Sequence, residues 1–387
     1  MKKPKRELGS GEVGRFDQRN TMFCRTLDPE RATPSILEMG RKHRGVRQHF
    51  SNDKPGYTMR DWAFTQAAYY FERWWGQGNV VGNTGPFKWD IDPTEVQLKT
   101  MAQGEKWIVS DPEEMSQNIK MAAKYLGASL VGLCKLDRRW IYSHRFNRVT
   151  HEHTPLDIPE EFEYAIVMAH EMNHNLLRTS PTFSGYAGTA HAYSTMVFVA
   201  SSLAHYIRGL GYKAIPCGND TALSIPLAID AGLGELGRNG QLITEKFGPR
   251  VRLSKVLTNL PLVPDKSIEF GVREFCEKCK RCAEECPGWA ISFSEPTTEG
   301  PDISNNHGLY KWYIDAEKCF AFWVRNGGTC GNCIRVCPFN KTQGVLHDGV
   351  RFLVRNASWF DPLLVRMDKL FGYGRRMKAE DVWKATG

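Results

Sequence analysis

The sequence predicts a layered α/β domain followed by a smaller, cysteine-rich domain that binds metal. From about residue 115 onward, helical and strand patterns alternate, which is typical of a sheet with helices packed on its faces. Eight of the 11 cysteines fall between Cys276 and Cys337. So tight a group late in a chain of 387 residues indicates metal ligation rather than a disulfide scaffold.

The expected elements alternate along the middle of the chain. Apolar patterns predict helices at 116–127, 189–208 and 222–232, and strands at 128–134, 164–169, 212–217 and 251–262. The second helix carries an apolar stripe made of Met196, Val199, Ala200, Leu203 and Ile207, and Gly209 and Gly211 should end it. Residues 1–115 are rich in aromatic side chains and show no clean period.

Composition excludes few classes of protein. No apolar run approaches the roughly 18 residues that a membrane span requires. The net charge of +8 is spread along the chain rather than gathered into basic blocks, so it is weak evidence for RNA or an anionic surface as a partner. We expect no nucleic-acid partner. The printed start, MKKPKRELGSGEVGRF, is basic and polar and contains no export signal. A cytoplasmic protein and an exported protein whose signal has been removed both remain open.

The cysteines form two similar runs. Cys276, Cys279, Cys282 and Cys286 precede Pro287 with C-x2-C-x2-C-x3-C-P spacing, and Cys319, Cys330, Cys333 and Cys337 precede Pro338 with C-x10-C-x2-C-x3-C-P spacing. The first is the bacterial ferredoxin spacing, in which the fourth cysteine crosses to the other cluster. We therefore expect two [4Fe–4S] clusters, one on Cys276, Cys279, Cys282 and Cys337 and one on Cys286, Cys319, Cys330 and Cys333. Zinc knuckles, the alternative, fit two such endings poorly.

Gly232, Gly234 and Gly237 spell G-x-G-x-x-G. A dinucleotide site needs a strand before these glycines and a helix after them. Here a helical pattern precedes them and the strand-like GQLIT follows. The order is inverted, so we expect close approach of the backbone to some other flat ligand.

His170, Glu171 and His174 spell the H-E-x-x-H of zinc peptidases. The histidine or later glutamate that would complete such a site is missing, because position 180 is Ser and no glutamate occurs between Glu171 and Glu235. The preceding segment has the pattern of a buried strand running into a turn, a geometry in which the two imidazoles share no metal. We expect no zinc site and treat both as ordinary loop histidines.

Long strings of this chain resemble one enzyme family. IEFGVREFCEKCKRCAEECP, KWYIDAEKCFAFW, CGNCIRVCPFNK and AGLGELGRNGQLITEKFGPRVRLSKVLTNLPLVPDK are similar to segments of the corrinoid-dependent reductive dehalogenases of organohalide-respiring bacteria. The resemblance runs from about residue 115 to FGYGRR near the end, and is loose before that. It implies a nitroreductase-like α/β domain that binds base-off cobalamin, beside a ferredoxin-like domain with the two clusters.

The resemblance also implies domain limits and site residues. The expected domains are an N-terminal region covering the active site at 1–115, the cobalamin-binding domain at 116–268, the ferredoxin-like domain at 269–342 and a C-terminal extension at 343–387. Tyr193 falls on the family's proton donor, with Asn219 and Arg252 as its catalytic partners. The substrate pocket would include Thr189, Trp323, Trp62 and Tyr69, and the corrin would contact Gly232, Gly234 and Gly237.

The implied activity is reductive removal of halide from a small organohalide at cob(I)alamin. A tyrosine is a weak acid, and a neighbouring cation such as Arg252 favours its anion. Without the resemblance, Tyr193 on its apolar stripe would be interpreted as a core residue. The rival function is epoxyqueuosine reductase, a tRNA-modifying enzyme with the same cofactors, and a pure electron-transfer protein is a third possibility.

The family also implies partners and a location. Electrons would come from an anaerobic respiratory chain, with a small membrane anchor protein as one route, and a homodimer is compatible with the sequence. We expect a protein held peripherally on the outer face of the cytoplasmic membrane after twin-arginine export, with a cytoplasmic location as the alternative.

Overall fold

The computed structural model describes residues 13–45, 51, 54–75, 85–89 and 106–384. The expected N-terminal region at 1–115 is therefore described in part, and the basic start at 1–12 lies outside the described residues.

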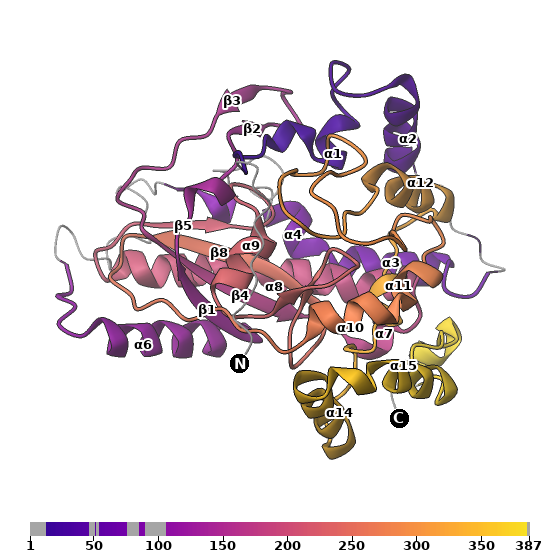
Figure 1. Cartoon of the computed structure of the whole chain (residues 1–387). Coiled ribbons are helices and arrows are strands. Elements are labelled where there is room, and N and C mark those ends of the chain that lie inside the picture. Colours follow the sequence, from indigo (N-terminus) through magenta and orange to yellow (C-terminus); the bar gives the residue numbers. More distant parts are fainter. Residues whose placement is uncertain (1–12, 46–50, 52–53, 76–84, 90–105, 385–387) are drawn as a thin grey trace.

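One antiparallel sheet forms the centre of the molecule (Figure 1). Its four strands, in spatial order, are β1 (Leu130–Lys135), β4 (Tyr164–Glu171), β8 (Val251–Thr258) and β5 (Ala214–Cys217). Each of the three neighbouring pairs is antiparallel. All four predicted strands are present, with ends that differ by a few residues.

Helices cover both faces of this sheet, so the domain has three layers. Alternate residues of a strand point to opposite faces. Accordingly, Ile166 and Val256 belong to the apolar core under α6 (Pro112–Tyr125) and α8 (Phe183–Gly209). Val167 and Leu257 belong to the core under α9 (Ser224–Asp230). The predicted layered α/β architecture is confirmed.

Two of the predicted helices are longer than their apolar patterns. α6 begins at Pro112, where the Asp111 carboxylate accepts hydrogen bonds from the amides of Glu113 and Glu114. α8 begins at Phe183, six residues before the predicted start, and the Thr182 hydroxyl accepts from the Gly185 amide. The small residues of this first turn obscured the helical period.

The remaining elements surround the sheet. Before α6 lie η1 (Gln18–Asn20), α1 (Met22–Arg25), α2 (Pro34–Gly45), α3 (Met59–Ala68), α4 (Tyr70–Trp75) and η3 (Gly85–Phe87). Between the strands lie η5 (Arg138–Trp140), β2 (His144–Phe146), β3 (His153–Pro155), α7 (His174–Leu177), β6 (Glu235–Leu236) and β7 (Leu242–Ile243). After β8 follow α10 (Val272–Cys279), α11 (Arg281–Glu284), α12 (Ala316–Asn326), α13 (Asn332–Arg335), α14 (Val345–Asn356), η6 (Ser358–Phe360), α15 (Asp361–Leu370) and η7 (Ala379–Trp383).

The cysteine-rich segment is held from two sides. The C-terminal helices α14 and α15 pack back onto it, since Val354 and Leu364 share an apolar core with Phe275 and Phe339. On the other side, α12 packs against α1 and α2 of the N-terminal region, as Figure 1 shows, through Met22, Ile36 and Phe320. Among the residues the structure describes, no helix is both long enough and apolar enough to cross a bilayer.

Candidate active site and cluster sites

The fold brings Tyr193, Asn219 and Arg252 together. Tyr193 lies on α8, Asn219 follows β5, and Arg252 lies on the neighbouring strand β8. The Asn219 side-chain amide donates a hydrogen bond to the Tyr193 hydroxyl at 3.2 Å. The Arg252 guanidinium carbon lies 5.0 Å from the centroid of the Tyr193 ring. These are the three predicted catalytic residues, drawn from three elements.

Arg252 can donate a further hydrogen bond to a ligand. Its Nε is buried and has no hydrogen-bond partner in the described structure. A buried donor without a partner costs free energy, and such groups are over-represented where a ligand completes the site. The cation is therefore placed to act on Tyr193 and on whatever occupies the space beside it.

A buried lysine fixes the loop that carries Asn219. Lys255, on β8, has no exposed surface, and its ammonium donates to the Ala222 carbonyl at 3.0 Å and to the Gly218 carbonyl. Asp220 in the same loop accepts from the Gly218 amide at 2.8 Å. Burial lowers the pKa of Lys255 and raises that of Asp220. Sequence reasoning missed Lys255, which stands in β8 between Ser254 and Val256.

A group of tyrosines packs around Tyr193. The Tyr69 ring stacks on the Tyr193 ring, with centroids 5.6 Å apart, and meets Tyr186 edge-on at 5.7 Å. Burial raises the pKa of Tyr186 to about 12 and that of Tyr69 well above its ordinary value. Both therefore stay protonated at neutral pH. Tyr69 was predicted to line the substrate pocket, and its contact with Tyr193 supports a place at this site. Tyr186 was not predicted.

A cavity of about 330 Å³ is lined in part by Tyr186. It is lined by His43, Arg44, Trp62, Arg73, Tyr186, Gly327, Gly328 and Thr329. Trp62 was predicted as a pocket residue, and its ring also packs on Phe183 at 5.0 Å. The cavity joins the N-terminal helices to the loop after α12, so it is formed by segments far apart in the sequence.

Two predicted pocket residues lie elsewhere. The Thr189 hydroxyl faces the Met172 sulfur at 3.5 Å, inside the protein. Trp323 packs on Phe23, with ring centroids 5.9 Å apart, next to Phe320. Neither lines this cavity, although the indole nitrogen of Trp323 is buried without a partner in the described structure. Their contact with substrate remains a prediction.

The eight clustered cysteines fall into two spatial groups. Burial is the largest cause of the raised pKa of seven of these thiols. Among the smaller causes, the charge of Cys337 raises the pKa of Cys276, Cys279 and Cys282. The charge of Cys286 likewise raises the pKa of Cys319, Cys330 and Cys333. The fourth cysteine of each run thus lies near the other run, and crossed ligation remains a prediction.

These groups suit iron–sulfur clusters. Cys276, Cys279, Cys282 and Cys337 line one cavity together with Arg238, Asn239 and Phe339. Thiols whose pKa is raised by burial stay neutral without metal, whereas metal binding removes their protons. Amides also point at sulfur, since Ala290 N–H lies 3.3 Å from Cys286 Sγ. The donors therefore fit two [4Fe–4S] clusters, with the ligand sets as predicted from spacing still to be tested.

Packing within the protein explains why residues 232, 234 and 237 are glycines. A Cβ at Gly232 would lie 2.4 Å from the Lys266 carbonyl oxygen, and one at Gly234 would lie 2.1 Å from that of Ile243. At Gly237, a Cβ would meet the Ile243 side chain at 2.9 Å. Packing against this chain's own atoms accounts for all three. The inverted order of elements is confirmed, because α9 precedes the segment and β6 follows Gly234.

The H-E-x-x-H residues do not share one helix. His170 and Glu171 end β4 and His174 opens α7, so the predicted strand and turn are confirmed. The expectation of a loop was wrong for His170, which is 1% exposed, with its Nε2 2.7 Å from the Ser254 hydroxyl. Glu171 pairs with Arg250 instead.

Comparisons with known proteins agree with this geometry. A family model described as a 4Fe-4S double cluster binding domain matches residues 275–340. The tetrachloroethene reductive dehalogenase of Sulfurospirillum multivorans is 41% identical over 299 residues, covering 71% of this chain and 60% of that protein. This chain therefore spans about 60% of the length of that relative.

A solved structure shows the same fold. The catabolic reductive dehalogenase NpRdhA, in complex with 3-bromo-4-hydroxybenzoic acid, superposes with a TM-score of 0.71 at 23% identity, over 97% of this chain and 49% of that one. By contrast, the epoxyqueuosine reductase of Bacillus cereus is 30% identical over 126 residues, 29% of this chain. With these matches and the two groups of cysteines, the chain belongs to the corrinoid-dependent reductive dehalogenases, a family of oxidoreductases that carry two [4Fe–4S] clusters.

Proposed function

We propose that this chain reduces an organohalide, R–X + 2e⁻ + H⁺ → R–H + X⁻. The observation that carries the proposal is the convergence of Tyr193, Asn219 and Arg252 in a protein with two groups of four cysteines. A carbon–halogen bond offers little to acid–base catalysis alone. The chemistry therefore needs a strong reductant together with a placed proton donor.

Cobalamin, when bound, supplies the strongly reducing and nucleophilic metal that carbon–halogen reduction requires. The residues of this chain are suited to the remaining tasks. Tyr193 donates the proton that the carbon gains as halide leaves with the carbon–halogen electron pair. Arg252, 5.0 Å from the ring, stabilises the tyrosinate that remains, and solvent restores its proton.

Asn219 and Tyr69 hold the tyrosine for this transfer. The Asn219 amide donates to the Tyr193 oxygen, an interaction that strengthens as negative charge develops there. Tyr69 stacks on one face of the ring and so limits its rotation. We infer that Thr189, Trp62 and Trp323 contact the substrate, and that the backbone near Gly232, Gly234 and Gly237 contacts the corrin.

The rival, a tRNA-modifying reductase, is less favoured. Its similarity is confined to less than a third of the chain. The partners and location remain part of the proposal: a small organohalide, a respiratory electron donor that reaches the enzyme by way of a membrane anchor protein, a homodimer, and a position on the outer face of the cytoplasmic membrane. Membrane fractionation of the native organism, with and without high salt, tests the location.

Anaerobic reconstitution with cobalamin, iron and sulfide tests the function. The holoenzyme is supplied with reduced viologen and a panel of chloroethenes, haloalkanes and halophenols, and halide release is measured. We expect release with at least one compound and a lack of it in Tyr193→Phe. No release from any compound, alongside reduction of epoxyqueuosine in tRNA, would favour the rival.

A further inference from the structure

Two histidines and an aspartate meet on the β2–β3 hairpin, far from the cysteines in the sequence. Cross-strand pairing places His144 opposite Pro155 and Phe146 opposite His153, so His144 and His153 are diagonal neighbours on one face. Their rings stack with centroids 4.7 Å apart. Asp17 lies over them, and one ligand atom from each residue lies within 4.8 Å of the other two.

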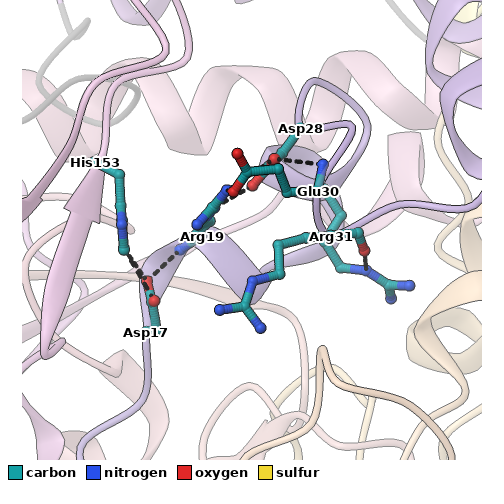
Figure 2. Close-up of polar contacts among 7 residues, drawn as sticks. Asp17, Arg19, Asp28, Glu30, Arg31 and His153 are labelled. Atoms are coloured by element: carbon teal, nitrogen blue, oxygen red, sulfur yellow. Dashed lines mark hydrogen bonds and ion pairs between the residues drawn. The ribbon is translucent and has the colours of Figure 1, made fainter.

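Contacts of the neighbouring residues hold Asp17 in place. The Arg15 guanidinium, two residues before Asp17, donates to the carbonyls of Tyr142 at 2.7 Å and Leu156 at 2.6 Å. The Asp17 carboxylate also accepts from the Arg19 amide at 2.9 Å. In Figure 2 the Arg19 guanidinium turns toward Asp28 and Glu30, while Asp17 faces His153. The carboxylate is thus left to the histidine rather than to an arginine.

We propose that Asp17, His144 and His153 bind a divalent transition metal such as zinc. His153 Nε2 lies 3.0 Å from Asp17 Oδ2. Ligand bonds of about 2.0–2.1 Å at a tetrahedral angle place two ligand atoms about 3.3 Å apart, so the ion can enter with little movement. Two imidazoles and a carboxylate suit zinc and its neighbours in the first transition row. A fourth position stays open to water.

The site would clamp the N-terminal segment to the hairpin. Asp17 precedes α1, where Arg25 pairs with Glu317 of α12, the helix that also carries Cys319. The metal would therefore stabilise a support of the second cluster without touching the active site. The proposal does not depend on dehalogenation.

Zinc retention by the reconstituted holoenzyme tests the site. Clusters are confirmed by iron content, zinc is added and excess removed, and bound zinc is measured by mass spectrometry. We expect one zinc per wild-type chain, and affinity at least about tenfold lower in His144→Ala and Asp17→Asn. His307→Ala is the control, because His307 pairs with Glu299 at 2.9 Å on a different segment. Absence of zinc from the wild type, or equal zinc in all variants, would overturn the proposal.

A separate observation concerns Arg238, which is 1% exposed beside the first group of cysteines. Its Nε donates to the Cys276 carbonyl at 3.0 Å, and its Nη1 to the carbonyls of Ser292 at 2.8 Å and Ser294 at 3.0 Å. Its plane also lies 4.4 Å from the Trp312 ring centroid. The remaining nitrogen, Nη2, is buried without a partner in the described structure.

Arg238 differs from the other cations near these cysteines. Arg281 and Lys341 both pair with Asp368, so a carboxylate offsets their charge. The hydrogen bonds of Arg238 go to neutral carbonyls. Acidic groups lie near both sets of cysteines, Glu284 beside Cys279 and Asp315 beside Cys319, and Arg335 near Cys330 lies 3.9 Å from Glu285. In the described structure, Arg238 is thus a buried cation at the first group whose hydrogen bonds reach no carboxylate.

We infer that Arg238 raises the reduction potential of the cluster held by Cys276, Cys279, Cys282 and Cys337. A buried cation stabilises the added electron, and Nη2 is free to donate to a cluster sulfur. Arg238 is thus a positioning and tuning residue. The inference rests on the two clusters and not on the halogenated substrate.

Potentiometric EPR on the holoenzyme tests this. Cys276→Ser identifies which midpoint belongs to the first cluster. In Arg238→Gln that midpoint should shift to lower potential while the other stays, and Arg238→Lys should shift less. Arg273→Gln, whose arginine stacks on Tyr310 at 5.0 Å without lining this cavity, is the matched control. An unshifted first-cluster midpoint in Arg238→Gln, or an equal shift of both midpoints, would overturn the inference.

Discussion

The cluster domain and the tyrosine site are built in opposite ways. The cysteine ligands are largely local, because short spacers bring most of the thiols of a run together and only Cys286 and Cys337 are predicted to cross between the runs. The tyrosine site is non-local, since Tyr193, Asn219 and Arg252 meet only after α8, β5 and β8 have packed. Spacing can therefore identify the first site, whereas the second needs the whole sheet.

The difference predicts how each site fails. A missing cysteine should abolish a cofactor, whereas a change at the tyrosine should leave the cofactors in place and slow the chemistry. Substitutions at each site can test this difference.

The largest effect should come from Cys286→Ala. The charge of Cys286 raises the pKa of Cys319, Cys330 and Cys333, so Cys286 lies near them. Its loss should therefore remove a ligand from the second cluster and leave the first cluster intact. Activity should fall below detection because electrons cannot reach the site. EPR and iron content measure the outcome, with Cys134→Ala, a buried cysteine of the sheet, as control. Damage confined to the first cluster would contradict the crossed ligation.

Arg252→Leu should be nearly as harmful while sparing every cofactor. It removes the cation beside Tyr193, so the hydroxyl stays but its anion loses stabilisation. We expect turnover to fall by about 10²- to 10⁴-fold, the usual range for general acid catalysis. Arg252→Lys should recover part of the rate. A variant with unchanged turnover and full cobalt and iron content would remove Arg252 from the mechanism.

Tyr193→Phe isolates the proton itself. Losing one hydroxyl changes little volume, so folding and cofactor content should survive. The proton donor is lost, and turnover should fall by about 10²- to 10⁴-fold. Tyr186→Phe is the matched control on the same helix, since its ring faces Tyr69 rather than Asn219. Near-wild-type turnover in Tyr193→Phe would mean that this tyrosine is a core residue.

Asn219→Ala should have a smaller effect. The variant deletes one hydrogen bond to the Tyr193 hydroxyl, and a bond of this kind contributes about 0.5–1.5 kcal/mol. Turnover should therefore drop by roughly tenfold or less. The loop should keep its shape, because Lys255 and Asp220 hold it independently. A loss as large as that of Tyr193→Phe would assign Asn219 a direct part in proton transfer.

Sequence reasoning reached the two regions unequally for physical reasons. The strands follow from local pattern, and the structure agrees with their placement, including the strand that ends at His170 and Glu171. The cluster ligands also follow from local spacing and remain a prediction. Lys255 and Tyr186 escaped notice because their role depends on contacts across elements. The glycines of G-x-G-x-x-G were assigned to a flat ligand, and the fold shows in addition that a Cβ there would meet Lys266 or Ile243; contact with the corrin remains a prediction. A glycine in a sequence shows that something comes close, and only the fold shows what.

The smallest effect on activity should come from His170→Gln, which tests the decoy motif through stability instead. Burial lowers the pKa of His170 from its ordinary 6.5 to about 3. Between those values the unfolded chain binds a proton that the native chain excludes. The free energy of unfolding should therefore fall as pH decreases below 6.5, by up to about 1.4 kcal/mol per pH unit from this group. In His170→Gln that acid-side decline should be shallower, while dehalogenation at neutral pH stays close to wild type. Melting temperatures between pH 4 and about pH 7 measure the slope, with His205→Gln on the exposed side of α8 as control. Loss of a bound metal in His170→Gln with both clusters intact would instead restore the peptidase-like interpretation of the motif.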